Sequence, residues 1–228
     1  MIIAIIPARG GSKRIPRKNV KLFNGVPILQ RVIKIVKESG IFDRICVSTE
    51  DGEIARLAVE WGCEVPFIRP NNLADDFCKT VDVIKHGIIE LQNVGWSPRY
   101  VCCIYPTSIF LDSKTIRVGY SKLIQSKDRF IISVSEISDN RFLRSMNIDD
   151  RGIAKINFPQ YVNYRSQDLP KFFCDAGQFY WASTITWLNH PDILTSEPLT
   201  IELERNAIVD IDNPEDWLAA EKLLANNH

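Results

Sequence analysis

The sequence predicts an α/β fold in which a doubly wound, mixed but mostly parallel sheet is covered by helices. Two observations carry this prediction. From Ile2 to Ser135, short apolar runs alternate with amphipathic stretches, which is typical of repeated βα units. The chain has 228 residues, 45% hydrophobic and 25% charged, which is the composition of a globular protein with a substantial core.

The elements follow in order from these patterns. Ile2–Pro7 reads as a buried strand, Ile28–Ser39 as a helix that Gly40 ends, and Arg44–Ser48 as a second strand. A short helix over Glu53–Trp61, closed by Gly62, places its apolar residues on one face. The further elements expected up to residue 135 are a strand at Val65–Ile68, a helix at Val81–Gln92, a strand at Tyr100–Tyr105, a helix at Lys114–Ser126 and a strand at Phe130–Ser135.

The pattern changes after Ile137. Residues 138–176 are polar and irregular but rich in Phe and Tyr, and a loop of this length is usually functional or covered by a partner. Returning strands are expected at Gln178–Ala182 and Ile208–Ile211. A last helix at Pro214–Ala225 has Asn213 as its N-cap. We therefore treat residues 1–228 as one domain carrying an arm at 138–176.

Charge and targeting signals narrow the class of protein. The formal net charge is zero, which does not suggest a nucleic-acid partner, yet the first 37 residues hold nine Lys or Arg and no acidic residue. That start fits a small anionic ligand. We see no signal peptide and no apolar run of about 20 residues that would span a membrane. The six cysteines show no CxxC spacing, so we expect a cytoplasmic protein with reduced thiols.

A basic, glycine-containing loop follows the first strand. Gly10 and Gly11 allow the backbone to bend sharply and to approach a ligand closely, and successive N–H groups in such a turn bind anions. Six basic residues lie between Arg9 and Lys21 without an acidic residue, a density that suits a nucleoside triphosphate. Neither GxxxxGK[ST] nor GxGxxG is present, which argues against a Walker loop and against a nicotinamide-dependent oxidoreductase.

Two carboxylates stand near the C-terminus. Asp210 and Asp212 occupy positions i and i+2 of an expected strand, so both point to one face with Cα atoms roughly 6.6 Å apart. Mg²⁺ takes oxygen ligands, commonly one or two carboxylates together with phosphate oxygens and water. The alternative is an acidic strand end in which Asp212 helps to cap the last helix.

Several stretches carry a resemblance to a known family. The segment PARGGSKRIPRKN, with VSTED at 47–51, YPTS at 105–108, RSQDLP at 165–170, GQFY at 177–180 and DID at 210–212, resembles the CMP-sialic acid synthetase family of cytidylyltransferases along nearly the whole chain. The resemblance implies a three-layer, Rossmann-like nucleotidyltransferase domain with a projecting arm that makes a homodimer. It also implies the transfer of CMP from CTP to the anomeric hydroxyl of an acidic nine-carbon sugar.

The resemblance also assigns residues. CTP would be bound by Ala8, Arg9, Gly10, Gly11, Ser12, Lys13, Lys18, Asn19, Arg69 and Thr80. Arg9 and Lys18 would stabilise charge on the phosphates during catalysis, and Asp210 and Asp212 would hold Mg²⁺. The sugar would meet Tyr105, Arg165, Gln167, Asp168, Gln178 and Tyr180. No protein general base is evident.

The identity of the sugar rests on finer similarities. Tyr105, the serine inside RSQD and Gln178 look more like the pseudaminic acid enzymes than the N-acetylneuraminate enzymes of this family. The residues after Ser108 differ from those of many relatives, so the resemblance does not define which side chains form the floor of the pocket near Tyr105. The same reaction on N-acetylneuraminate, legionaminate or a keto-deoxy-octulosonate sugar, and a catalytically silent nucleotide-binding protein, are the alternatives.

Overall fold

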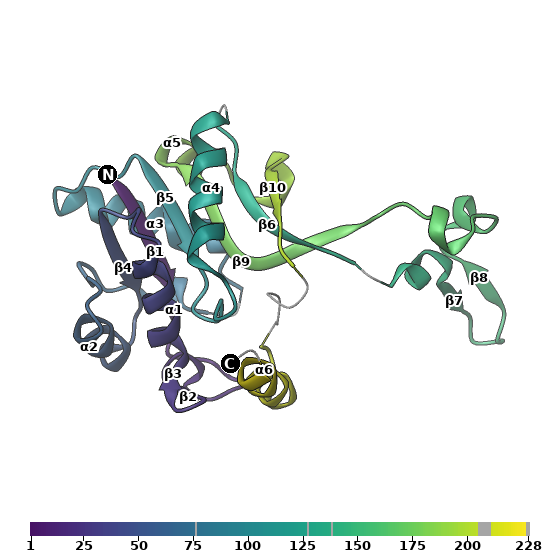
Figure 1. The fold of residues 1–228 in the computed structure, drawn as a ribbon, viewed down its shortest axis with the longest axis horizontal. Helices are drawn as coiled ribbons and strands as arrows, with labels where there is room; N and C mark the ends of the chain where they lie inside the picture. Colours follow the sequence, from purple (N-terminus) through teal and green to yellow (C-terminus); the bar gives the residue numbers. More distant parts are fainter. Residues whose placement is uncertain (76, 127, 138, 205–210, 227–228) are drawn as a thin grey trace.

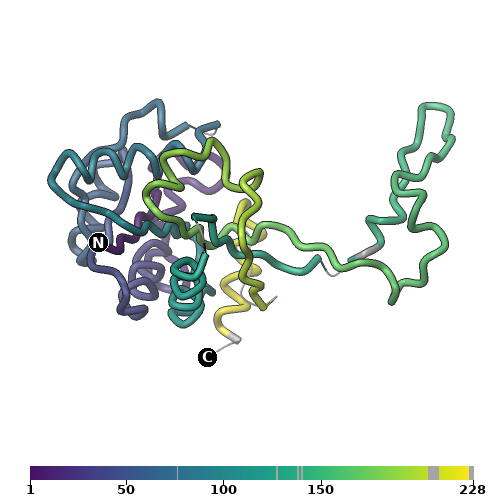
Figure 2. Tube along the Cα trace, turned by 90° about the horizontal axis from the view of Figure 1, so that it is seen from above, coloured from purple at the N-terminus to yellow at the C-terminus, as the bar shows by residue number. Residues whose placement is uncertain are grey.

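A computed structural model describes residues 1–228 except 76, 127, 138, 205–210 and 227–228. It shows a body built on one central sheet, from which a long arm projects (Figures 1 and 2). The strands of the central sheet are β1 (Ile2–Pro7), β4 (Arg44–Ser48), β5 (Tyr100–Ile104), β6 (Ile131–Glu136), β9 (Phe173–Ser183) and β10 (Leu199–Glu202).

The sheet is mixed and mostly parallel, as predicted. Its strand order is β10-β6-β9-β5-β1-β4. β1 pairs in parallel with β4 and β5, and β10 pairs in parallel with β6. β9 lies between β5 and β6 and runs antiparallel to both. The carboxyl ends of the other strands therefore meet at one edge, where α/β proteins usually bind ligands.

Helices cover both faces of this sheet, which gives the expected three layers. The helices are α1 (Ile28–Glu38), α2 (Gly52–Glu60), α3 (Thr80–Asn93), α4 (Ser113–Gln125), α5 (Thr184–Asn189) and α6 (Pro214–Asn226). Buried residues of α1, α2, α4 and α6 share one apolar core, and those of α3 and α5 share the other. Alternate strand residues divide between the two cores, for example Ile6 and Ile5 of β1.

Most predicted elements are confirmed within one or two residues, and one is wrong. Val65–Ile68 forms no strand. Only Glu64 bridges to Cys46, because Pro66 has no N–H with which to continue the ladder. β9 begins five residues before the predicted Gln178. The predicted strand at Ile208–Ile211 falls largely outside the described residues, and Ile211 itself is not in a strand.

Three features of the body were not predicted from the sequence. They are α5, β10, and a small hairpin of β2 (Leu22–Phe23) and β3 (Val26–Pro27) that directly follows the basic loop. The hairpin packs against the C-terminal helix, where Phe23 meets Trp217 edge to face with ring centroids 5.2 Å apart. It thereby ties the last helix to the first loop of the chain.

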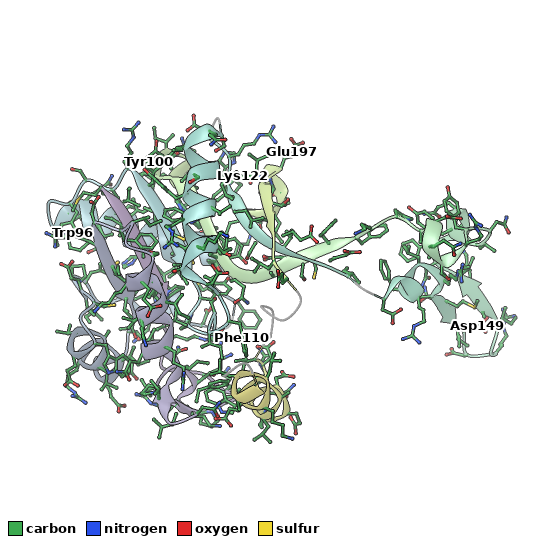
Figure 3. All side chains as sticks on the ribbon, viewed as in Figure 1. Trp96, Tyr100, Phe110, Lys122, Asp149 and Glu197 are labelled. Carbon is green, nitrogen blue, oxygen red and sulfur yellow. The ribbon has the colours of Figure 1, made fainter. Side chains whose placement is uncertain are left out.

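The arm is formed by the segment between β6 and β9 and contains more regular structure than expected. A second hairpin, β7 (Met146–Ile148) and β8 (Ala154–Ile156), lies in the outer part, and Asp149 follows β7 at its turn (Figure 3). Short 3₁₀ turns at Asn140–Arg144, Pro159–Tyr161 and Ser166–Asp168 complete it. At the base, Ile137 N–H donates to Phe172 O over 2.8 Å, so the chain leaves and re-enters the body at neighbouring points.

None of the helices formed by the described residues has the length and apolar character that a bilayer crossing requires. All six cysteines are free thiols. Four of them are buried in the core, and burial raises the pKa of Cys63, for example, to about 12, so its thiol is unreactive at neutral pH.

Candidate active site

A cleft of about 650 Å³ opens at the carboxyl ends of β1 and β5. Its lining is unusually basic and includes seven of the ten residues predicted to bind CTP: Arg9, Ser12, Lys13, Lys18, Asn19, Arg69 and Thr80. Arg14, Tyr105 and Asp212 also line it. The structure thus brings together residues from both ends of the chain around one basic cavity.

The first turn of the basic loop is held by neighbouring backbone and by one carboxylate. Ala8 N–H donates to Ser48 O over 2.9 Å, and Gly10 N–H donates to Glu50 Oε1 over 2.7 Å. A Cβ on Gly10 would stand 2.4 Å from Asp51 Oδ2, so a side chain is excluded there by the protein itself. Ala8, Gly10 and Gly11 do not line the cleft, and a Cβ on Gly11 would meet open space.

Glu50 supports the cleft, and no role was predicted for it from the sequence. Its second carboxylate oxygen accepts from Arg69 over 2.8 Å, and the Arg69 side chain is only 3% exposed. Burial pushes the pKa of Glu50 upward, but the hydrogen bond from Arg69 and those from the Glu50 and Gly10 amides outweigh it and lower the pKa. Glu50 therefore fixes the loop and Arg69 relative to each other. The sequence signal that could have identified Glu50 is its position just after a buried parallel strand, because α/β proteins usually bind ligands at that end of the strands.

Two of the six basic residues counted in the loop serve the fold. Arg17 adopts a left-handed backbone (φ 56°) and pairs with Asp51 and Glu53 at the start of α2. The hydrogen bond to Asp51 raises the pKa of Arg17 and lowers that of Asp51. Lys21 lies over the Trp217 ring, 4.6 Å from its centroid. The cations that line the cleft are accordingly Arg9, Lys13, Arg14, Lys18 and Arg69.

Unsatisfied polar atoms lie on two of the lining residues. Asn19 donates through Nδ2 to Arg9 O over 2.8 Å, while its buried Oδ1 has no hydrogen-bond partner in the described part of the chain. The buried Nε of Arg69 is likewise unpartnered there. Buried polar groups are normally paired, so an acceptor and a donor left open beside a cleft indicate a ligand with complementary groups.

The C-terminal side of the cleft carries Asp212. Its two carboxylate oxygens accept from Arg14 at 2.8 Å each, and Lys18 Nζ lies 3.8 Å from Oδ1. Lys18 Nζ also donates to Ile211 O over 2.7 Å. The helix cap predicted at Asn213 is confirmed, since its side chain accepts from Asp216 N–H over 2.8 Å. Asp216 in turn accepts from the Asp212 and Asn213 amides.

Of the predicted metal pair, Asp212 lies within the described residues and Asp210 lies outside them. Asp212 presents a partly exposed carboxylate to the cleft, which is a hard oxygen donor of the kind Mg²⁺ prefers. Among the described residues there is no cluster of three or more His, Cys, Asp or Glu side chains that would hold a metal ion by itself. The donor set fits an ion that completes its shell with phosphate oxygens and water.

A second cavity of about 230 Å³ shares Thr80 and Tyr105 with the cleft. Thr80 Oγ1 and the Tyr105 hydroxyl lie 2.5 Å apart, and the Tyr105 ring meets Tyr180 edge to face. The Tyr180 hydroxyl donates to Asp175 Oδ2. Burial raises the pKa of Tyr105 to about 12, so its hydroxyl keeps its proton at neutral pH. Asp192, Ile193 and Leu194 complete a wall that is part polar and part aliphatic.

The other predicted sugar residues lie elsewhere. Gln178 is buried and donates through Nε2 to Ala176 O, and it lines neither cavity. Arg165, Gln167 and Asp168 lie in the arm, where Arg165 pairs with Asp168 at 2.6 Å. The structure of this single chain therefore brings Tyr105 and Tyr180 to the cavities and does not bring the arm residues there.

Comparison with known proteins adds independent information. The family described as Cytidylyltransferase matches residues 3–217. A pseudaminic acid cytidylyltransferase from Campylobacter jejuni is 35% identical over 99% of this chain and 97% of its own length. The CMP-N,N'-diacetyllegionaminic acid synthase of Legionella pneumophila is 32% identical with the same coverage. N-acylneuraminate cytidylyltransferase A of Danio rerio is 30% identical over 97% of this chain and half of its own length.

Solved structures agree on the fold. CMP:2-keto-3-deoxy-manno-octonic acid synthetase, complexed with CTP, superposes with a TM-score of 0.76 over 100% of this chain and 99% of that one, at 14% identity. A 4-diphosphocytidyl-2C-methyl-D-erythritol synthase from Anaerococcus prevotii superposes with a TM-score of 0.64 over 98% of both chains, also at 14% identity. At this identity the likeness concerns the fold.

Proposed function

The chain belongs to the cytidylyltransferase family, and from that premise we propose that it transfers the CMP moiety of CTP to the anomeric hydroxyl of pseudaminic acid. The observation that supports this most is the pairing of a basic cleft with an adjoining smaller cavity across Thr80 and Tyr105. The cleft suits a triphosphate, and the smaller cavity suits a sugar. The full-length relatives named for pseudaminic and legionaminic acids favour a nonulosonic acid.

In the proposed reaction the anomeric oxygen attacks the α-phosphorus of CTP. A P–O bond forms there, the bond between the α-phosphorus and the oxygen that bridges to the β-phosphate breaks, and pyrophosphate leaves while the sugar hydroxyl loses its proton to water. The protein contributes positioning and charge neutralisation, as in phosphoryl transfer generally. Arg9, Lys13 and Lys18 line the cleft where the phosphates would lie. The open acceptor on Asn19 and the open donor on Arg69 suit the amino group and the ring acceptors of cytosine.

Magnesium is part of the proposal. Asp212, together with Asp210, would hold the ion, which when bound neutralises charge on the phosphate oxygens. We also propose a cytosolic location, where thiols stay reduced and CTP is available.

We further propose that the arm makes a homodimer and carries Arg165, Gln167 and Asp168 to the partner's sugar site. Two facts support this. Arg165 and the turn Ser166–Asp168 belong to the arm that projects from the body (Figure 1) and line neither cavity of their own chain, and the arm exposes Met146, Ile148 and Ile153. Exposed apolar residues gathered on one segment usually mark an interface.

The test is a substrate panel. Purified protein with CTP and Mg²⁺ is offered pseudaminic acid, legionaminate, N-acetylneuraminate and a keto-deoxy-octulosonate in turn, and pyrophosphate release is measured with and without EDTA. We expect the highest kcat/KM for pseudaminic acid, a preference for CTP over UTP, and no turnover in EDTA until Mg²⁺ is restored. Equal or better turnover of N-acetylneuraminate would defeat the assignment of the sugar and leave the cytidylyl transfer standing. Pyrophosphate release from none of the sugars would defeat the proposed reaction.

A further inference from the structure

Arg14 lines the cleft and pairs there with Asp212, the carboxylate that is proposed to bind metal. We propose that Arg14 is a positioning residue which holds Asp212 while the cleft is empty and passes to the triphosphate when the nucleotide and its metal enter. This inference rests on the proposed nucleotide chemistry, but it concerns a residue that neither the loop pattern nor the resemblance singled out.

The geometry shows why the ion pair between Arg14 and Asp212 must break before a metal ion binds. Arg14 Nη1 and Nη2 donate to the two oxygens of Asp212 at 2.8 Å each, so the planar fork faces the whole carboxylate. Lys18 Nζ stands 3.8 Å from the same group. A divalent cation that binds this carboxylate would meet a guanidinium already seated on both oxygens, and like charges at that distance repel. Metal binding at Asp212 and the Arg14 pair therefore compete.

The pair is also able to open. The Arg14 side chain is 66% exposed and that of Asp212 is 36% exposed, and ion pairs between exposed side chains are weak. A guanidinium recognises phosphate with the same fork that it offers a carboxylate, and Arg14 lines the same cavity as Arg9 and Lys13. A triphosphate in the cleft thus supplies the replacement partner.

Asp212 can stay in place when Arg14 moves to the triphosphate. Its amide donates to Asp216 Oδ2 over 3.0 Å, and the preceding carbonyl of Ile211 accepts from Lys18. The helix behind it is anchored on the β2–β3 hairpin, where Asn24 N–H and Nδ2 donate to the Glu221 side chain and carbonyl at 3.0 Å each. The carboxylate is therefore held at the cleft by its backbone when the guanidinium leaves.

The experiment measures two binding equilibria that do not depend on the sugar. Mn²⁺ binding without nucleotide is followed by the electron paramagnetic resonance of the free ion, and CTP binding at saturating Mg²⁺ by calorimetry. Arg14→Gln should bind Mn²⁺ about tenfold more tightly, because a competing positive charge is removed. It should bind CTP about tenfold more weakly, because a charge-assisted bidentate contact is lost.

Controls make the result specific. Arg56→Gln removes an equally exposed arginine whose partner, Glu60, lies on the same helix α2 and outside the cleft, and it should change neither equilibrium. In an Asp212→Asn background, Arg14→Gln should no longer tighten Mn²⁺ binding. Unchanged Mn²⁺ affinity in Arg14→Gln, a tightening that persists without the Asp212 charge, or unchanged CTP affinity would each overturn the inference. A protein that shows these binding changes but releases no pyrophosphate would refute the proposed reaction and leave the inference intact.

Discussion

The cleft and the arm are stabilised in opposite ways. Around the cleft, ion pairs join residues far apart in sequence: Arg14 with Asp212 at a separation of 198 residues, and Arg17 with Asp51 at 34. In the arm, the ion pairs of Arg141, Arg151 and Arg165 join residues only two or three positions away. The ion pairs at the cleft thus join distant parts of the body, whereas these three arm pairs are local, and longer-range arm contacts such as that of Phe142 with Phe172 stay within the arm.

The burial of side chains also differs between the cleft and the arm. The loop and strand ends that form the cleft rest on two cores of fully buried residues. Within the described part of the arm, Leu143 and Leu169 are buried, while Ile148 is 71% exposed and Met146, Ile153, Val162 and Tyr164 are about half exposed. Within the arm, Phe142 packs edge to face on Phe158 and Phe172, while the exposed apolar side chains are the surface that the proposed homodimer would cover.

The largest effect should come from removing a charge at the cleft. Lys18→Ala should lower kcat/KM for CTP by about 10²-fold, equivalent to ~3 kcal/mol of transition-state stabilisation. Lys18 lines the cleft and contacts both Ile211 and Asp212, so its loss also loosens the link between the two ends of the chain. Pyrophosphate release measures the effect, and Lys34→Ala, at a 79% exposed position of α1, is the control. Near-normal turnover in Lys18→Ala would show that the cleft does not carry the reaction.

The second prediction concerns the buried support of the cleft. Glu50→Gln keeps the shape of the side chain but removes the charge that faces nearly buried Arg69 and replaces one of two accepting oxygens with a donor, so it should lower the free energy of unfolding by about 2 kcal/mol. Urea titration with a fluorescence readout measures it. No loss of stability would mean that Arg69 finds another partner.

The pH dependence of the stability of Glu50→Gln tests the same ion pair between Glu50 and Arg69. Because the pKa of Glu50 is lowered in the folded protein, its contribution is present above its unfolded pKa of about 4.3 and is lost as the pH falls through the lower folded value. The stability difference between wild type and Glu50→Gln should therefore be constant near neutral pH and shrink below about pH 4. A difference that grows on acidification would contradict the assigned ion pair.

The smallest effect on stability should come from removing the arm. Residues 138–171 can be replaced by a two-residue turn, because Ile137 and Phe172 are already hydrogen-bonded neighbours. We expect a monomer with an almost unchanged melting temperature and about tenfold lower turnover, ~1.4 kcal/mol in the barrier. Light scattering and pyrophosphate release measure the two properties. An intact protein that is monomeric at micromolar concentration, or an excised one that stays dimeric, would disprove the proposed role of the arm.

The sequence predicted the body well for a physical reason. Buried parallel strands and one-faced helices leave strong periodic patterns, so the bounds of α1, α3 and α4 and the position of the basic loop were predicted closely. The outcome at Val65–Ile68 differs because a single proline removed a donor from an otherwise apolar run.

The parts that could not be predicted depend on distant partners. Nothing local distinguishes Arg14, which pairs across 198 residues, from Arg17, which turns to α2. Gln178 was assigned to the sugar from resemblance, but its strand register points it into the protein, where it bonds to Ala176. β10 is short and half exposed, so its pattern is weak, and its place beside β6 is set by tertiary pairing.

The strand order has a consequence for the growing polypeptide on the ribosome. β9 lies between β5 and β6 but is synthesised after both, and the whole arm separates it from β6. Until Phe173 and the residues after it emerge, β5 and β6 each present an unpaired edge, which is the kind of edge that joins other nascent chains. A chain that stops short of β9 can assemble β4, β1 and β5 but cannot join them to β6, so premature termination in the arm would leave an aggregation-prone fragment rather than a smaller enzyme.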